Sequence, residues 1–225
     1  MAASHSANQS AIGCTFVDRP RAAVALAAVT VGLDFTCVSK HVYGDVRVCL
    51  AMIMFASAVY LSDGHHKSLG LRVSPVQGWS HWILTSLKIG TAVAVFILLG
   101  LGSCHAMDYH VYFPVTDPSQ VPSRFMHMCF VAPTVEEAVY RLSACGLIAA
   151  VIGNRRTIAV NGLLFGFLHV LYGNPSPENL VGGFFLAWAF LKSETILIPM
   201  VLHSVGNLLV LVGQVGAWYM LGEAG

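Results

Sequence analysis

Long apolar stretches separated by short polar breaks make up most of the chain from residue 22 to residue 221. A helix needs about 20 mostly apolar residues to cross the hydrocarbon core of a bilayer, and several of these stretches approach that length. The last stretch is long enough for one tilted helix or two short ones. The pattern therefore predicts an all-α fold, a polytopic transmembrane bundle of seven or eight helices. The predicted helical stretches are residues 22–39, 46–61, 79–102, 123–152, 157–171, 178–191 and 195–221.

The same pattern divides the chain into a polar N-terminal tail (1–21), a set of N-terminal transmembrane helices (22–102) and a membrane core (123–221). Composition agrees, because 56% of the 225 residues are hydrophobic and 10% are charged, whereas a soluble domain is usually about 25% charged. The net charge of +1 gives no reason to expect a nucleic-acid partner. The six cysteines are scattered without a C-x-x-C pair, so we infer neither disulfides nor a zinc site from them.

Lysine and arginine gather at alternate polar breaks, whereas the break at residues 103–122 contains neither. Basic residues mark cytoplasmic loops, so we expect a multi-pass membrane protein with a cytoplasmic N-terminus. Lys40 and Arg47 oppose this orientation, because they flank the first outer loop. The basic residues that support it are Arg19, Arg21, Lys67, Arg72, Arg155, Arg156 and Lys192.

The segment from Thr134 to Arg141 places two adjacent carboxylates and an arginine inside an apolar stretch. One charge at the centre of a bilayer costs roughly 2.5–3.5 kcal/mol on insertion scales, so three together require an explanation. Glu137 and Arg141 are four residues apart on one helix face and can form an ion pair. Glu136 points about 100° away, with Tyr140 one turn beyond it. A purely structural ion pair between helices explains Glu137 and Arg141 but leaves Glu136 unexplained.

Three other residues interrupt the apolar stretches. Asp34 lies in the first stretch and Lys88 in the third. Lys88 can extend to the membrane surface or pair with Asp34, and the sequence leaves both open. Pro133 lies one turn before the two carboxylates and removes a backbone hydrogen bond, so we expect a kink or a break in the helix there.

Two histidines share helix faces with a second residue: Phe165 lies four before His169, and Asn207 four after His203. Each histidine alone is explained by a hydrogen bond to a neighbouring helix, and Asn207 by interhelical contact. At about 1.5 Å per residue, however, Glu136, His169 and His203 lie roughly 22, 20 and 16 Å from the inner ends of their helices. They therefore fall in one layer of a core about 30 Å thick. The G-x-x-x-G pair Gly162 and Gly166 would let another helix approach the His169 helix closely.

A carboxylate and an imidazole in a semi-buried pocket can take a proton from water and make it a nucleophile. A second imidazole and an amide can donate hydrogen bonds to the developing oxyanion. Together these groups suit amide hydrolysis without a covalent intermediate. Two histidines and one glutamate also suffice for catalytic zinc, although these residues do not form H-E-x-x-H and come from separate helices. The sequence leaves the zinc alternative open.

Three motifs in order, Glu136-Glu137-x-x-x-Arg141, Phe165-x-x-x-His169 and His203-x-x-x-Asn207, resemble the CPBP family of intramembrane proteases. This family includes the CAAX-processing and bacteriocin-processing proteases, also called abortive-infection proteins, and is related to the Ras-converting CAAX endoprotease. The resemblance covers about residues 125–212.

The resemblance implies a glutamic-type protease without a cofactor. In it Glu136 activates water with help from His169, and His203 and Asn207 stabilise the oxyanion. Glu137 and Arg141 resemble supporting positions, and we place Tyr140 and Phe165 with them. A weaker similarity, at residues 172–179 and 186–193, is to members that process C-terminal sorting anchors of exported proteins (myxosortase-like).

The expected function is therefore an intramembrane endopeptidase that cuts near the membrane in a membrane-anchored protein or peptide, either at a sorting anchor or at a CAAX-like tail. Its expected partners are this substrate and the lipid bilayer. Two alternatives remain: a non-catalytic immunity or scaffold protein of the same fold, and a small transporter with an ionisable site at the midplane. A transporter of that kind would contain inverted repeats, and none is visible between the halves of the sequence.

Overall fold

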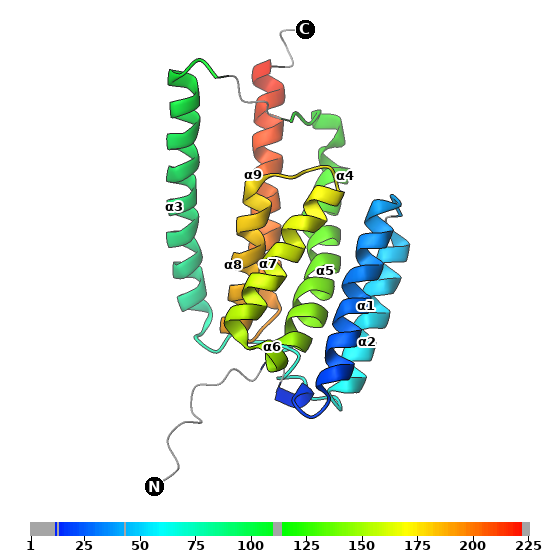
Figure 1. Cartoon of the computed structure of the whole chain (residues 1–225). Helices are drawn as coiled ribbons and strands as arrows, with labels where there is room; N and C mark the ends of the chain where they lie inside the picture. Colours follow the sequence, from blue (N-terminus) through cyan, green and yellow to red (C-terminus); the bar gives the residue numbers. More distant parts are fainter. Residues whose placement is uncertain (1–11, 13, 43, 110–113, 222–225) are drawn as a thin grey trace. The chain divides into compact units, whose positions relative to one another are not determined.

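The computed structural model describes residues 12, 14–42, 44–109 and 114–221, and this part of the chain is helical without strands (Figure 1). The predicted all-α fold with seven helices is confirmed, and the last stretch is one helix. Residues 121–152 form one continuous helix made of five consecutive segments. The separate helices are α1 (Pro20–Ser39), α2 (Asp45–Leu61), α3 (Trp79–Ala106), α7 (Asn154–Leu171), α8 (Pro177–Ser193) and α9 (Leu197–Leu221). The segments of the continuous helix are α4 (Val121–Met126), η3 (His127–Val131), α5 (Ala132–Glu137), η4 (Ala138–Cys145) and α6 (Gly146–Ile152), and short 3₁₀ turns form η1 (Cys14–Phe16) and η2 (Pro118–Gln120).

Three of these helices, Pro20–Ser39, Trp79–Ala106 and Leu197–Met220, are long and apolar enough to cross a membrane. A 20-residue helix such as α1 is about 30 Å long at about 1.5 Å per residue, which matches the hydrocarbon core of a bilayer. Large apolar side chains of α3, such as Phe96 and Leu98, are exposed along its length, as expected for a helix that faces lipid.

The chain divides into two compact units that do not follow its order. The first contains the described residues up to Val76 together with Ala132–His203, and the second contains Gln77–Val131 and the described residues from Ser204 onward. In the first unit α1 and α2 form an antiparallel hairpin that packs against η4, while α7 and α8 form a second pair (Figure 1). The N-terminal hairpin is thus packed directly against η4, the segment that follows the two adjacent carboxylates of α5.

Small residues bring α7 and α8 close together, as predicted for Gly162 and Gly166. A Cβ atom added at Gly162 would lie 2.5 Å from the ring of Phe184, and one at Gly166 would lie 2.6 Å from the side chain of Leu180. On α8, a Cβ at Gly183 would lie 3.0 Å from the backbone oxygen of Gly162. The contact therefore depends on glycine on both helices, and it fixes the helix that carries His169.

The helix around Pro133 does not break, contrary to the prediction. Two segments of it are π-helical: η3, which ends two residues before Pro133, and η4, which follows Glu137. The wider turn of η3 includes Cys129, whose carbonyl a proline four residues later would meet in a regular α-helix, so the chain continues without a break. Wide turns of this kind are frequent at functional sites.

Asparagine side chains bond to a carbonyl in each wide segment. In the first unit the Asn161 amide donates to the carbonyl of Tyr140 at 2.7 Å, and in the second unit the Asn207 amide donates to the carbonyl of Met128 at 2.7 Å. A wide turn shifts the backbone hydrogen bonds, and a buried carbonyl without a donor is costly. Both asparagines therefore stabilise irregular backbone, and Asn161 does so in the segment that follows the two glutamates.

The predicted N-terminal tail lies largely outside the described residues. The described part is packed rather than free: Ile12 is 4% exposed and Phe16 is fully buried. Phe16 belongs to an apolar cluster with Ala23 and Leu69. Ile12 and Phe16 therefore pack within the first unit.

Candidate active site

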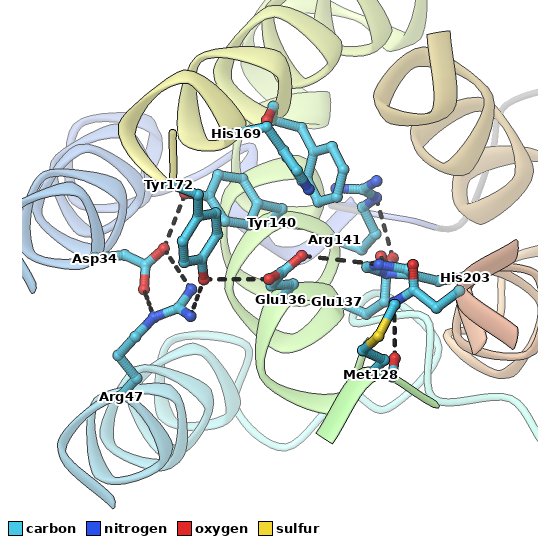
Figure 2. Close-up of polar contacts among 12 residues, drawn as sticks. Asp34, Arg47, Met128, Glu136, Glu137, Tyr140, Arg141, His169, Tyr172 and His203 are labelled. Atoms are coloured by element: carbon cyan, nitrogen blue, oxygen red, sulfur yellow. Dashed lines mark hydrogen bonds and ion pairs between the residues drawn. The ribbon is translucent and has the colours of Figure 1, made fainter. Parts of the chain in front are cut away.

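The two adjacent carboxylates of the first unit are buried and make different contacts (Figure 2). Glu136 is 4% exposed and Glu137 is fully buried. Their direct partners are Tyr172 at the end of α7, His203 in the first turns of α9 and Arg141 on the same helix, and Tyr172 joins them to the Asp34–Arg47 pair of α1 and α2. The structure thus gathers charged and polar side chains from helices far apart in the sequence around one short segment.

Glu137 lies between an arginine and a histidine. The Arg141 Nε atom is 3.1 Å from Glu137 Oε2, and both side chains are fully buried, so the predicted ion pair is present. The Arg141 guanidinium also lies over the ring of Phe165, 4.6 Å from its centroid. On the other side, His203 Nδ1 is 2.8 Å from Glu137 Oε1. Glu137 therefore links Arg141 to His203 and holds the imidazole in place.

Glu136 makes a separate set of contacts. The Tyr172 hydroxyl donates to Glu136 Oε1 at 3.2 Å, and His203 Nε2 lies 3.8 Å from Glu136 Oε2. The second distance is too long for a direct hydrogen bond. One oxygen of this carboxylate is therefore held by a hydroxyl, while the other faces an imidazole without bonding to it.

Hydrogen-bond chemistry fixes the proton on one nitrogen of His203. A carboxylate accepts hydrogen bonds and does not donate them, so Nδ1 donates to Glu137, and Nε2 carries a hydrogen only when the ring is protonated. The cluster contains three carboxylates, Asp34 included, and two guanidiniums, Arg47 and Arg141. A protonated His203 would balance these charges, as buried charges require.

His169 reaches the cluster through aromatic contacts. Its Nδ1 lies 2.9 Å from the carbonyl of Phe165, which only accepts, so Nδ1 is the donor and Nε2 of the neutral ring is an acceptor. The His169 ring lies 4.6 Å from the Phe165 ring and 5.8 Å from the Tyr172 ring. Phe165 in turn lies 5.7 Å from the ring of His203. In the part of the chain that the structure describes, no hydrogen bond joins His169 to Glu136.

The structure therefore brings together most of the predicted site residues, within the first unit. Asn207 belongs to the second unit and makes the bond to Met128 described above. Those gathered in the first unit are Glu136, Glu137, Tyr140, Arg141, Phe165, His169 and His203.

Three residues of the cluster were not predicted: Asp34, Arg47 and Tyr172. Arg47 Nε lies 2.8 Å from Asp34 Oδ1, and Nη2 lies 3.1 Å from Oδ2, so the partner of Asp34 is Arg47, where the sequence had left Lys88 open. Arg47 Nη1 donates to the Tyr172 hydroxyl, and the Tyr140 hydroxyl donates to Asp34 Oδ2 at 2.9 Å. The signal for Asp34 and Arg47 was their charge in consecutive apolar stretches. Tyr172 belonged to the weaker similarity at residues 172–179, but nothing there marked it as a partner of Glu136.

A metal site has little support from the arrangement of side chains. Among the described residues, no three histidine, cysteine, aspartate or glutamate side chains are arranged to hold a metal ion together. The oxygen of Glu136 that faces His203 is near a single imidazole, and the other oxygen accepts from a phenol. The residues present therefore do not fit a zinc centre, and we derive no step through a metal.

Long apolar helices and a buried cluster of carboxylates, guanidiniums and imidazoles define an all-helical membrane protein with candidate acid–base machinery. Residues 118–209 match the family described as Type II CAAX prenyl endopeptidase Rce1-like. This part of the chain is an Rce1-like domain of the CPBP family, so the predicted family resemblance is confirmed there. The match indicates a CAAX-type intramembrane protease in general. No curated protein and no solved structure gives a significant match to the chain.

Proposed function

We propose that the chain is an intramembrane endopeptidase of the glutamic type, in which Glu136 activates the attacking water. The observation that carries this proposal is the position of Glu136: a carboxylate that is 4% exposed, bonded to Tyr172 and 3.8 Å from the imidazole of His203. It lies in the Rce1-like domain. A buried ionisable residue in a membrane protein usually serves a function, because burying it is costly.

The reaction begins with a water molecule between Glu136 and the carbonyl carbon of the scissile peptide bond. Glu136 takes one proton from this water through Oε2, while His169 Nε2 accepts a hydrogen bond from the other O–H, which stays on the water oxygen, and so orients the molecule. The oxygen attacks the carbonyl carbon, and the carbonyl oxygen becomes an oxyanion. Glu136 then gives its proton to the departing nitrogen, the C–N bond breaks, and a carboxylic acid and an amine leave.

The oxyanion receives a hydrogen bond from the protonated His203 Nε2, and the family resemblance assigns a second donor role to the amide of Asn207. The bond from His203 Nδ1 to Glu137 favours this protonated form, because the carboxylate is a charged acceptor. Arg141, 3.1 Å from Glu137 Oε2, holds the Glu137 carboxylate in place. The supporting residues thus hold His203 ready to donate before the negative charge develops, which is how preorganised donors accelerate acyl transfer.

The proposed substrate is a membrane-anchored protein or peptide that is cut near the membrane, at a C-terminal sorting anchor or a CAAX-like tail. We place the protein as a multi-pass protein in a bacterial inner membrane, with a cytoplasmic N-terminus. The burial of Arg47 against Asp34 supports this orientation. Arg47 had opposed a cytoplasmic N-terminus because it flanks the first outer loop, but a buried, paired arginine is not a free positive charge of that loop.

The test is Glu136→Gln, which preserves the shape of the side chain and removes the base. Two measurements follow: cleavage of a farnesylated Cys-aliphatic-aliphatic-X peptide by the purified protein, and sequencing of protein C-termini in cells. Glu178→Gln, at the exposed start of α8, is the control. Loss of processing at normal expression in Glu136→Gln alone supports the proposal. Unchanged processing would refute the role of Glu136 as the base, whereas a wild-type protein that cleaves nothing, with an unchanged cellular phenotype in Glu136→Gln, would indicate a scaffold protein.

A further inference from the structure

Five side chains of the first unit form a closed chain of contacts that begins and ends on the helix carrying Glu136 (Figure 2). Glu136 accepts from Tyr172 at the end of α7, and Tyr172 accepts from Arg47 on α2. Arg47 is paired with Asp34 on α1, and Asp34 accepts from Tyr140, one turn after Glu136. Asp34 and Arg47 lie outside the Rce1-like residues 118–209.

The direction of each hydrogen bond in this chain is determined. A guanidinium donates and does not accept, so the Tyr172 oxygen must be the acceptor for Arg47. The single hydroxyl hydrogen of Tyr172 is then available for Glu136 Oε1. Glu136 is therefore held by one oxygen, and its other oxygen, Oε2, remains on the side of His203.

Arg47 is held firmly enough to transmit this constraint. Its guanidinium makes two bonds to Asp34, at 2.8 and 3.1 Å, and the side chains of Arg47 and Asp34 are only 8% and 0% exposed. Bidentate pairs of this kind fix orientation as well as charge. The Tyr140 hydroxyl donates to Asp34 Oδ2 at 2.9 Å, the oxygen that Arg47 Nη2 also contacts. A simple salt bridge between α1 and α2 would require neither tyrosine.

We propose that Arg47 and Asp34 are positioning residues for peptide hydrolysis, which act through Tyr172 to hold the carboxylate of Glu136 in its reactive orientation. This inference rests on the proposed function of Glu136. It makes the N-terminal helix hairpin part of the active machinery. Misplacement of a reacting group by about 1 Å can cost on the order of 100-fold in rate, so small losses of position here have large effects.

The experiment compares Tyr172→Phe and the double variant Asp34→Asn/Arg47→Met with wild type, all as full chains in lipid nanodiscs. The double variant removes both charges together, because a single one left buried and unpaired would threaten folding. Tyr60→Phe, on the exposed face of α2, is the matched control. The first measurement is the infrared carboxylate band of Glu136, obtained by subtracting the spectrum of each variant carrying Glu136→Gln in addition. The second is kcat and KM with the farnesylated peptide.

The expected result is a shifted Glu136 band in both variants, with kcat reduced roughly 10- to 100-fold and KM changed less than about twofold, while Tyr60→Phe matches wild type. A band that stays at the wild-type position in folded Tyr172→Phe overturns the inference, whether or not the peptide is cleaved. So does an unchanged kcat in a protein that Glu136→Gln inactivates. Full activity of Glu136→Gln would refute the proposed function instead, which separates the two failures.

Discussion

Replacing Arg141 by alanine tests how strongly the buried ion pair stabilises the fold. Arg141 and Glu137 are both fully buried and lie 3.1 Å apart. The change leaves the Glu137 carboxylate with His203 as its remaining charged partner. It also removes the guanidinium from the face of Phe165. Breaking a buried pair by removing one partner costs about 3–5 kcal/mol, so we expect a loss of unfolding free energy of that size.

Cys145 provides a reporter for this loss, because its thiol is free and fully buried. In a variant whose other five cysteines are serine, a thiol-reactive dye labels Cys145 only when the protein opens. A loss of about 3–5 kcal/mol raises the open population roughly one hundred- to several thousand-fold, and the labelling rate rises with it. Arg156→Ala, which removes an exposed arginine, is the control and should leave the rate unchanged.

The double variant Glu137→Gln/Arg141→Ala gives a second reading of the same pair. It removes the negative charge that the single variant leaves buried, so we expect it to label more slowly than Arg141→Ala. If Arg141→Ala labels as slowly as wild type and keeps full activity, the pair is not the stabilising contact described here. A double variant that labels faster than the single one would also refute the reasoning, since the unpaired carboxylate could not then be the cause.

Three further predictions address the helix contact, the chemistry and the orientation. Gly183→Ala should destabilise the protein by about 1–3 kcal/mol through overpacking, because its Cβ would lie 3.0 Å from the Gly162 backbone oxygen, whereas Gly182→Ala has open space and should not; Cys145 labelling measures both. Peptide cleavage should survive strong chelators, and loss of activity restored by zinc would refute the metal-free mechanism. A reporter fused after Ser176 should read outside the cytoplasm, and a cytoplasmic signal would reverse the proposed orientation.

The helical fold could be predicted from the long apolar stretches, because a segment inside a bilayer must satisfy its backbone hydrogen bonds internally and therefore forms a helix. The ion pair between Glu137 and Arg141 could be predicted for a local reason, since residues four apart share a helix face. The predicted break at Pro133 was wrong, because the π-helical segment η3 accommodates the proline and the helix continues. A change of helical pitch depends on packing and leaves no periodic mark in eight residues or fewer.

The links around Glu136 could not be predicted for a different reason. Tyr172 and Glu136 are 36 residues apart, and Arg47 and Tyr172 are 125 apart, so their contact depends on how the helices pack. Asp34 and Arg47 were visible as charges in apolar stretches, but a charge in the sequence does not show which other charge it pairs with. Their assignment required the hairpin of α1 and α2.

The pairing of Asp34 with Arg47 also bears on how the chain enters the membrane during synthesis. Each residue lies on a different helix of the hairpin, 13 positions apart, and each alone would oppose insertion by roughly 2.5–3.5 kcal/mol at the bilayer centre. Partitioned together, the two helices present a neutral pair to the lipid. The hairpin is therefore expected to leave the translocon as one unit, with α1 retained until α2 has been made.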